Sequence, residues 1–499
     1  MPPGTIAEVL APALAEAPDR PALVAPDRTL SYAELDAEAN RAAGALRDLG
    51  LRRGDRIAVS LPNDSRIVVL FHAVMRAGGI WVGLSGQLAP PEQQALLDHA
   101  RASIAIGCAA GPPSSASRRT LTPPDWARAL NGARPVPPGP ADPHAAAAIA
   151  YTSGTTGQPK GVVHSQHNLL VPGAVLAATR GYDTALRKAD SLPMTILNLL
   201  VLSTLLTSQA RGTAIISDAR RAGEVAGWLR ATGATVWNGV PALLHDMARD
   251  PAIPSSSLDG LTEVWAGGDN LSEEIRAAFG HRFAPPLTGT YGLTEAPTVV
   301  AIEDRHAPHV PGGSGQVLPH LRVFTSPAGD GAAAEGLGEL CVTGRDDGPW
   351  AGVYRPMLGY WDDPQATARA LAGGVLATGD LGTVSDDGQV SVRDRSKLVI
   401  VRGGANVYPA EVERVIGAHA GAVASAVFAT ADTRLGSRVA AVVQARGPGL
   451  DVDDLRRHCL ARLARYKVPE TWHVTTGPLP RNAMGKIDRA AVTARWAGR

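Results

Sequence analysis

Cysteine and lysine are both scarce in this chain of 499 residues. The three cysteines, Cys108, Cys341 and Cys459, lie far apart and include no CxxC pair, which excludes a disulfide framework and a zinc site of the usual spacing. So few cysteines are typical of a reducing compartment, and we therefore expect a cytoplasmic protein. Only five lysines occur, at positions 160, 188, 397, 467 and 486. All but Lys188 fall inside the motifs described below.

Aromatic content and net charge are also low. With 4% aromatic residues and a net charge of +1, the chain has neither a base-stacking surface nor a broad basic face for nucleic acid. Residues 1–18 lack the basic region of a signal peptide. The most apolar run, 192–206, is too short to span a membrane and contains polar residues, so we expect a buried helix there. A hydrophobic content of 45% is that of an ordinary globular protein.

Helices and strands alternate through the first part of the chain. Ser31 and Glu34 have the spacing of a capping box and open an amphipathic helix. Residues 56–61 have the pattern of a buried strand, 67–77 that of a helix, and 80–82 that of a second strand. This alternation predicts a mostly parallel sheet with helices on both faces.

The rest of the chain divides into regions that differ in composition and in their pattern of predicted helices and strands. Residues 109–145 are rich in proline, serine and alanine, and we predict a loose surface connection there. A second α/β region follows from 146 to 300, and short strands with Gly/Asp turns at 311–394 indicate a β subdomain. The last hundred or so residues have a mixed α+β pattern. We therefore predict an α/β protein with a large domain at 1–394 and a small one at 395–499.

The clearest motif is the glycine-rich loop at 151–162 (YTSGTTGQPKGV), which follows an apolar strand pattern. Its glycines let backbone N–H groups turn toward an anion, its hydroxyl groups add donors, and Lys160 supplies a mobile positive charge. The expected phosphate-binding residues are Thr152, Ser153, Gly154, Thr155, Thr156, Gly157 and Lys160. It is not a Walker A loop, because no Gly-Lys-Ser/Thr ending is present. The alternative is a polar surface turn.

Four further segments follow in order: 288–296 (TGTYGLTEA), 377–382 (ATGDLG), 394–413 (DRSKLVIVRGGANVYPAEVE) and 480–489 (PRNAMGKIDR). Together with the glycine-rich loop they resemble the adenylate-forming superfamily of acyl- and aryl-CoA synthetases, peptide-synthetase adenylation domains and beetle luciferases. The chain looks closest to class I acyl-CoA synthetases, and the resemblance covers nearly all of it. It implies a large domain of α/β subdomains and a β subdomain, followed by a small mobile α+β domain.

The resemblance assigns a nucleotide site. Tyr291 is expected to stack on adenine, Thr294 to contact the α-phosphate and Glu295 to help hold Mg²⁺. A flat ring suits a base, and a hard cation bridging phosphates prefers carboxylate oxygen. Asp380 and Arg395 are expected on the ribose, whose two hydroxyls a carboxylate can accept. The other implied ATP-binding residues are Gly268, Asp269, Asn270, Thr290 and Gly292. The alternative is a pair of ordinary turns, one of them with a structural glutamate.

The resemblance also assigns roles near the C-terminus. Lys397 is the implied pivot of the small domain, and Gly403 and Gly404 are expected to line a thiol channel, where missing side chains leave room for a pantetheine arm. Lys486 is expected to reach the acid and the α-phosphate only when the domains close. The implied catalytic residues are Lys486, Thr294, Glu295 and Lys160. The alternatives are a plain hairpin followed by a helix, and a solvated surface lysine.

Three places depart from the family pattern. Asp269-Asn270 stands where relatives carry Ala-Pro or a Glu-Pro variant, and Gln166 where they usually carry histidine. The segment 193–200 replaces a Pro-x-Phe-His-x-x-Gly pattern and brings Asn198 near the position that gates the acid pocket. Asn198 is equally well an ordinary helix residue. The candidate acid-pocket residues are Asn198, Trp237, Asn238, Gly267 and Gly292.

The predicted reaction is ATP-dependent activation of a small carboxylic acid as acyl-AMP, with release of pyrophosphate, followed by transfer to coenzyme A. A second hypothesis is a stand-alone adenylation enzyme that loads a carrier protein, or that adenylates an unusual oxyanion such as nitrite for transfer to an amine. A third is a catalytically silent nucleotide-binding relative. No Ser-His-Asp pattern or metal-ligand cluster in the sequence points to hydrolysis. Neither nucleic acid nor a membrane span is expected.

Overall fold

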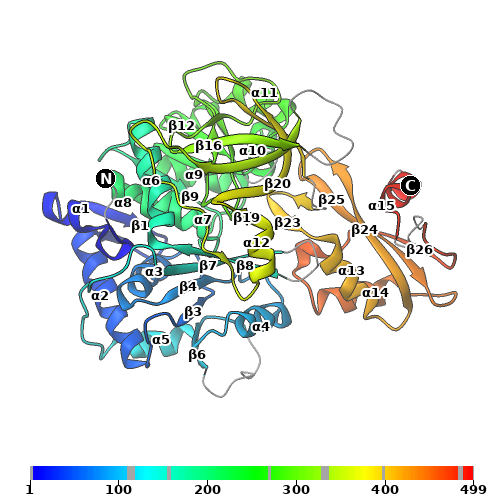
Figure 1. Cartoon of the computed structure of the whole chain (residues 1–499), viewed down its shortest axis with the longest axis horizontal. Coiled ribbons are helices and arrows are strands. Elements are labelled where there is room, and N and C mark those ends of the chain that lie inside the picture. The colour runs from blue at the N-terminus through cyan, green and yellow to red at the C-terminus, as the bar shows by residue number, and fades with distance from the viewer. Residues whose placement is uncertain are drawn as a thin grey trace.

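The computed structural model of the chain describes residues 4–109, 118–153, 159–267, 271–327, 337–395, 399–480 and 487–497. Within these ranges the chain forms four sheets, three of them in one large body and the fourth beside it (Figure 1). A short helical turn and a helix precede the first strand: η1 (Ile6–Glu8) and α1 (Ala11–Glu16).

The first sheet has seven strands in the order β18-β8-β7-β4-β3-β5-β6. Strands β3 to β7 are parallel, while β8 and β18 add an antiparallel edge. Its strands are β3 (Arg56–Val59), β4 (Ile80–Gly83), β5 (Ile104–Ile106), β6 (Arg119–Leu121), β7 (Ala146–Ser153), β8 (Pro159–Ser165) and β18 (Gly359–Tyr360), and its helices are α2 (Tyr32–Asp48), α3 (Ser65–Ala77), α4 (Pro90–His99) and α5 (Pro123–Leu130). The predicted capping box opens α2, because Ser31 Oγ accepts from Glu34 N and Glu34 Oε2 accepts from Ser31 N.

The prediction of a loose connection at 109–145 is wrong for its middle part. Strand β6 joins the sheet beside β5, and α5 follows it with Trp126 buried against the core. Thr122 and Asp125 form a capping box at the start of α5, where two prolines occupy the first turn. A proline-rich composition therefore concealed a helix start, since proline is well tolerated at that position.

The second sheet has nine strands in the order β15-β14-β13-β12-β11-β9-β10-β1-β2. Its strands are β1 (Pro21–Val24), β2 (Thr29–Ser31), β9 (Arg187–Asp190), β10 (Thr213–Ile216), β11 (Val236–Gly239), β12 (Glu263–Ala266), β13 (Leu287–Tyr291), β14 (Ala301–Ile302) and β15 (Gln316–Val317). The helices of this region are α6 (Gln166–Arg180), α9 (Ala222–Thr232), α10 (Pro241–Arg249), the 3₁₀ turn η3 (Ser255–Leu258) and α11 (Glu273–Arg282). The central strands run parallel, as their alternation with helices predicts.

The apolar run at 192–206 enters a largely buried helical stretch. It consists of α7 (Leu197–Leu200), a π-helical turn η2 (Val201–Leu205) and α8 (Leu206–Ala210). The prediction of a buried helix is confirmed from Leu197 onward, while Ile196 just before it is 48% exposed. None of the helices in the described ranges combines the length and the apolarity that a bilayer crossing requires.

The third sheet is the predicted β subdomain. It contains β16 (Leu321–Pro327), β17 (Gly338–Gly344), β19 (Leu371–Ala372), β20 (Val375–Val384) and β21 (Val390–Arg395), and the helix α12 (Pro364–Ala370) lies beside it. All of its pairings are antiparallel. Strand β21 extends through Arg395, one residue past the predicted domain boundary.

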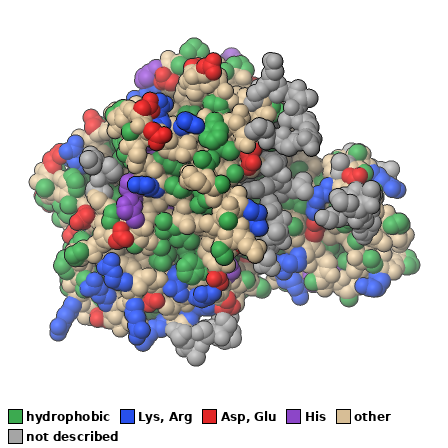
Figure 2. Space-filling model, in the orientation of Figure 1, with side chains coloured by type: hydrophobic (Ala, Val, Ile, Leu, Met, Phe, Trp, Pro, Cys, Tyr) green, Lys and Arg blue, Asp and Glu red, His purple; other side chains and the backbone are tan. Residues whose placement is uncertain are grey.

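The fourth sheet forms the small C-terminal α+β unit, here called the C-terminal lobe (residues 399–497). Its elements are β22 (Ile400–Arg402), β23 (Ala405–Val407), α13 (Pro409–Gly417), β24 (Ala422–Asp432), β25 (Gly436–Ala445), α14 (Val452–Leu460), η4 (Arg465–Lys467), β26 (Thr471–Thr475) and α15 (Arg489–Trp496). Figure 2 shows it as a lobe that projects from the larger body. The predicted fold class, a large α/β domain followed by a small α+β domain, is confirmed.

Candidate active site

The predicted phosphate loop connects two paired strands. Strands β7 and β8 are antiparallel neighbours, with Thr152 opposite Lys160, so the loop lies at the end of this hairpin. Residues 154–158 lie outside the described residues, and so do the predicted contacts of Gly154, Thr155, Thr156 and Gly157. The side chain of Ser153 is likewise not described.

Lys160 and Glu295 meet at a tyrosine that the sequence reasoning missed. Lys160 Nζ lies 4.9 Å from the centre of the Tyr360 ring, and the Tyr360 hydroxyl donates a 2.9 Å hydrogen bond to Glu295 Oε1. Strand β18 places Tyr360 opposite Val162 of β8, directly beside the hairpin. Burial and the neighbouring Glu295 carboxylate raise the pKa of Tyr360, so its hydroxyl stays protonated and can donate. Two predicted catalytic residues are thus joined through one ring.

The residues that are predicted to bind adenine and ribose also lie together. Tyr291, at the end of β13, donates its hydroxyl to Asp380 Oδ2 at 2.9 Å. Asp380 N donates to Thr378 Oγ1, which in turn donates to Leu340 O, so these bonds hold the backbone at Asp380. Arg395 stands opposite Asp380 in the register of β20 and β21, although its side chain is outside what the structure describes. Residues from the second and third sheets therefore converge here.

A buried histidine supports the loop that carries Thr294. His164, on β8, lies 2.7 Å from Thr294 O through Nε2. Burial lowers the pKa of His164 to about 4, so the ring is neutral near pH 7, and Nε2 carries the hydrogen because a carbonyl oxygen only accepts. Two residues earlier, a Cβ on Gly292 would lie 1.7 Å from Thr298 O, so only glycine fits there. The loop is thus held by His164 and is closely packed on itself at Gly292.

Strands β12 and β13 approach closely where the adenine wall is predicted. A Cβ on Gly267 would lie 2.3 Å from Thr290 Oγ1, and that hydroxyl donates to Ala266 O at 3.2 Å. Gly267 therefore allows the two strand ends to pack side by side. Gly268, Asp269 and Asn270, which complete the predicted wall, lie outside the described residues.

The candidate acid-pocket residues occupy different surroundings. Trp237 is fully buried in the core that includes residues of α9, α10 and α11, whereas the adjacent Asn238 stands opposite Asp190 on the neighbouring strand. Asn198 lies in α7 and is partly exposed. Their roles toward the acid remain predictions. Gln166 has a structural partner, because its Oε1 accepts the Ile6 N–H at 2.8 Å.

Lys188, the lysine outside the motifs, forms a buried ion pair. Its Nζ lies 3.2 Å from Asp190 Oδ2 and 4.9 Å from the centre of the Trp265 ring, and both charged side chains are fully buried. Burial lowers the pKa of Lys188 and raises that of Asp190, while each charge partly offsets the effect on the other. Both residues lie on β9, an inner strand of the second sheet.

The donor set at Glu295 fits a magnesium ion. Its Oε1 accepts from Tyr360, while Oε2 has no hydrogen bond or ion pair with any residue in the described ranges. Those ranges contain no cluster of three or more His, Cys, Asp or Glu side chains that could hold a metal by itself. Mg²⁺ commonly binds through one or two carboxylates together with substrate phosphates. Glu295 therefore suits a metal that arrives with a nucleotide.

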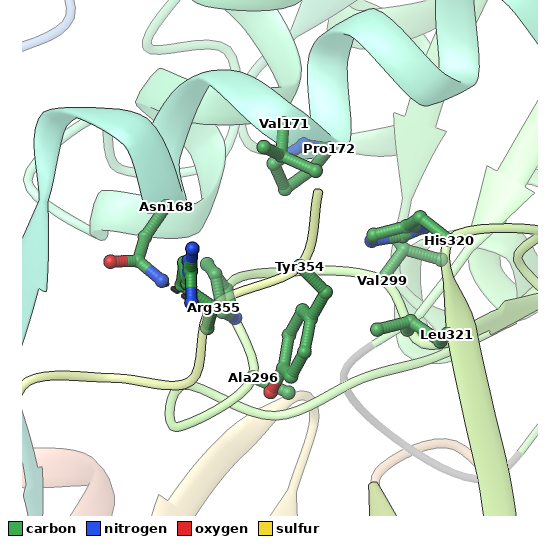
Figure 3. A pocket seen from close by; sticks show the side chains of 10 residues that line it. Asn168, Val171, Pro172, Ala296, Val299, His320, Leu321, Tyr354 and Arg355 are labelled. Atoms are coloured by element: carbon green, nitrogen blue, oxygen red, sulfur yellow. Dashed lines mark hydrogen bonds between the residues drawn. The ribbon is translucent and has the colours of Figure 1, made fainter. Parts of the chain in front are cut away.

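The described residues line a small cavity beside the loop that carries Thr294 (Figure 3). It is lined by Asn168, Val171, Pro172, Ala296, Pro297, Val299, His320, Leu321, Tyr354 and Arg355. Its volume of about 10 Å³ leaves room for a single water molecule at most. His320 Nδ1 and the Tyr354 hydroxyl have no hydrogen-bond partner among the described residues. The cavity is too small for an acid or a nucleotide.

The Gly403-Gly404 turn lies against the large domain. It joins β22 to β23 and precedes α13, so the expected hairpin and helix are both present. The φ angles of 57° and 84° are in the left-handed region that favours glycine. A Cβ on Gly404 would lie 3.2 Å from Val240 Cγ1, just after β11. Lys397 and Lys486 lie outside the described residues, and the hinge and the near-terminal catalytic lysine remain predictions.

Comparison with known proteins identifies the family of the chain. Residues 10–361 match the family model described as AMP-binding enzyme, and residues 411–486 match the AMP-binding enzyme C-terminal domain. A feruloyl-CoA synthase from Amycolatopsis sp. is 33% identical, with 94% of each chain covered. The fatty acid–[acyl-carrier-protein] ligase ScoC of Streptomyces coeruleorubidus is 32% identical, covering 96% of this chain and 94% of ScoC.

A solved structure shares the fold. A double mutant of o-succinylbenzoate CoA synthetase (MenE) from Bacillus subtilis, bound to a product analogue, superposes with a TM-score of 0.84 at 24% identity. The alignment covers 98% of this chain and 97% of that one. Both domains of the present chain are thus found in one known architecture.

Proposed function

Because the chain belongs to the AMP-binding enzyme family, we propose that it is an AMP-forming acid–thiol ligase. The resemblance to the adenylate-forming superfamily is confirmed by the family match. The proposed reaction converts a small carboxylic acid and ATP to acyl-AMP and pyrophosphate, and then transfers the acyl group to coenzyme A. The observation that carries the proposal is the convergence of Lys160, Tyr360 and Glu295, which come from three separate parts of the chain.

In the first step a carboxylate oxygen of the acid attacks the α-phosphorus of ATP, and the bond to pyrophosphate breaks. The enzyme's task is to position the reactants and to balance negative charge on the phosphates. Lys160 and Lys486 are the proposed cations, Thr294 the proposed contact to the α-phosphate, and Asp380 the proposed acceptor for the ribose hydroxyls. Magnesium, held by Glu295, would neutralise phosphate charge. Its presence is part of the proposal.

In the second step the thiol sulfur attacks the acyl carbon, and AMP leaves. We propose that the thiol enters along the Gly403-Gly404 turn, whose placement beside Val240 supports this role. The C-terminal lobe would turn about Lys397 between the two steps, with the domain boundary near 394/395. Such a rotation lets one pocket serve two reactions.

We propose coenzyme A as the acceptor, and a carrier protein as the second candidate because a ligase of that kind, ScoC, aligns over nearly the whole chain. A reducing compartment such as the cytoplasm is also proposed. It is supported by Cys108, Cys341 and Cys459, none of which forms a disulfide.

The test is a panel of carboxylic acids incubated with the protein and ATP, read first as acid-dependent ATP–pyrophosphate exchange. Acids that support exchange are then offered with coenzyme A, with a carrier protein, or with an amine, and the product is identified by mass. We expect an acyl-CoA. A carrier-bound thioester alone would favour the second candidate, an amide alone would contradict both, and no exchange with any acid would indicate a silent nucleotide-binding relative.

A further inference from the structure

The large domain and the C-terminal lobe meet at a largely buried carboxylate. Glu92, at the start of α4, accepts a hydrogen bond from Lys467 Nζ on Oε1 at 2.7 Å. Its other oxygen, Oε2, accepts the Ala464 N–H at 2.7 Å. Both partners belong to the C-terminal lobe, more than 370 positions away in the sequence. One side chain of the large domain thus receives two donors from the lobe.

The contact is shielded from water. The side chains of Glu92, Lys467 and Glu411 are 11%, 6% and 7% exposed. Ion pairs at this depth are much less screened than surface pairs, and removing one partner leaves an uncompensated charge. The ion pair of Lys467 with Glu92 therefore stabilises the docked lobe relative to the undocked one.

The lysine has one partner on each side of the interface. Lys467 Nζ also donates to Glu411 Oε1 at 2.8 Å, and Glu411 lies within the lobe, on α13. Burial raises the pKa of Glu411, while the nearby carboxylates raise that of Lys467 and keep it charged. If the lobe turned away, Lys467 would keep its pair with Glu411 and lose its bond to Glu92.

A second ion pair crosses the same interface. Arg434 of the lobe makes a two-pronged contact with Asp246 on α10, with N–O distances of 2.7 to 3.0 Å. These side chains are 52% and 30% exposed, so solvent and salt weaken the pair. It lies beside the Gly403-Gly404 turn, since Leu435 and Ala242 both lie within 4 Å of the Cβ position of Gly403. The Glu92–Lys467 pair is therefore better shielded from solvent than the Asp246–Arg434 pair.

We propose that Glu92 is a positioning residue for the thiol-transfer step. By holding Lys467 and the Ala464 N–H, it stabilises the arrangement in which the Gly403-Gly404 turn lies against Val240. The proposal rests on the two-step function and on rotation of the lobe between steps. Weakening the Glu92 contact lowers the population of the transfer arrangement, and it leaves the adenylation arrangement without a lost bond.

The substitution Glu92→Gln tests this with little disturbance to α4. Glu92 Oε2 also accepts the Ala89 N–H at 2.8 Å, as part of the helix cap. Glutamine keeps an acceptor for the cap and removes the charge that Lys467 needs. Glu34→Gln is the matched control, because Glu34 Oε2 accepts the Ser31 N–H at 2.8 Å in the same kind of cap on α2. Glu92→Asp, which keeps the charge but shortens the reach, is the second variant.

Two rates are measured for each purified full-length protein with an acid that the wild type accepts. One is acid-dependent ATP–pyrophosphate exchange, and the other is single-turnover transfer from supplied acyl-AMP to coenzyme A. In Glu92→Gln we expect transfer to slow about tenfold and exchange to stay within about twofold, with a smaller loss of transfer in Glu92→Asp. Glu34→Gln should keep both rates.

Equal losses in both steps, or wild-type transfer in Glu92→Gln, would overturn the proposal. Should Glu92→Gln fail to fold, the same two outcomes are judged on Glu92→Asp. A failure of the proposed function looks different, because then the wild type itself shows no exchange with any acid or forms no thioester.

Discussion

The predicted ATP site within the large domain and the contact between that domain and the C-terminal lobe are built from different bonds. In the site, buried hydroxyls of Tyr291 and Tyr360 donate to the carboxylates of Asp380 and Glu295. All four residues belong to the same domain, so these bonds form when that domain folds. At the interface two ion pairs and the Ala464 N–H bond to Glu92 join two bodies. The site is thus pre-organised, while the interface can be broken without unfolding either part.

The largest expected effect comes from removing a charge that the lobe is predicted to bring to the site. Lys486→Ala should lower ATP–pyrophosphate exchange by roughly 10² to 10³, because one well-placed cation is lost from the phosphate-transfer step. Transfer from supplied acyl-AMP to coenzyme A should be largely retained. Stopped assays of the two steps check this, and equal damage to both would contradict the role of Lys486.

A smaller effect is expected from disturbing the pre-organised site. Tyr360→Phe keeps the ring beside Lys160 but removes the hydroxyl that orients Glu295. Exchange should fall about tenfold, the scale of one hydrogen bond to a charged group, and the Mg²⁺ concentration for half-maximal exchange should rise. Acyl transfer to coenzyme A should change little.

Tyr354→Phe is the control for that substitution. Its hydroxyl is also buried, but within the described residues it has no hydrogen-bond partner, so removing it should leave both steps unchanged. An unaltered magnesium dependence in Tyr360→Phe, or similar losses in both variants, would show that the hydroxyl does not act through Glu295.

Acid should lower the free energy of unfolding of the large domain, because three of its histidines are buried in the neutral form. Burial lowers the pKa of His164 and His320 to about 4 and that of His72 to about 3, below the value of about 6.5 for an unfolded chain. As the pH falls, the unfolded state therefore takes up protons before the folded state does. The contribution of these histidines to the free energy of unfolding is present in full above about pH 6.5 and is lost as the pH falls below it. Between pH 6.5 and 5 each histidine should cost about 2 kcal/mol.

Urea unfolding at a series of pH values measures this loss. His320→Gln should reduce the slope of the free energy of unfolding against pH by about one proton over that interval. An unchanged slope would mean that His320 is protonated in the folded protein.

The smallest effect is expected at the exposed side of the interface. Arg434→Ala removes the pair with Asp246, and because solvent screens this pair, transfer to coenzyme A should slow only about twofold. The difference from wild type should vanish at high ionic strength. A loss larger than that of Glu92→Gln would reverse the ranking of the two contacts.

The motifs identify candidate residues that lie in short patterns of the sequence. The loop glycines, the TGTYGLTEA segment and the TGD segment are each local in sequence, so Lys160, Glu295 and Asp380 could be predicted. Tyr360 and Glu92 could not, since each contacts a partner 65 or more positions away and stands in no motif. Such contacts are set by the packing of sheets against one another and by the docking of the lobe.

The error at 109–145 had a different cause. The composition of the whole segment favours a loop, whereas the Thr-Pro-Pro-Asp start of α5 is a short pattern within it. That short pattern carries a cap and a proline at the first turn, both of which favour a helix. Trp126, four residues after the cap, is buried and attaches α5 to the hydrophobic core.

The most direct test of the central claim is acid-dependent ATP–pyrophosphate exchange in the wild type and in Glu295→Gln, measured side by side with magnesium. Exchange with at least one carboxylic acid, reduced by roughly 10² or more in the variant, is the predicted result. Exchange that Glu295→Gln leaves undiminished would contradict the site described here.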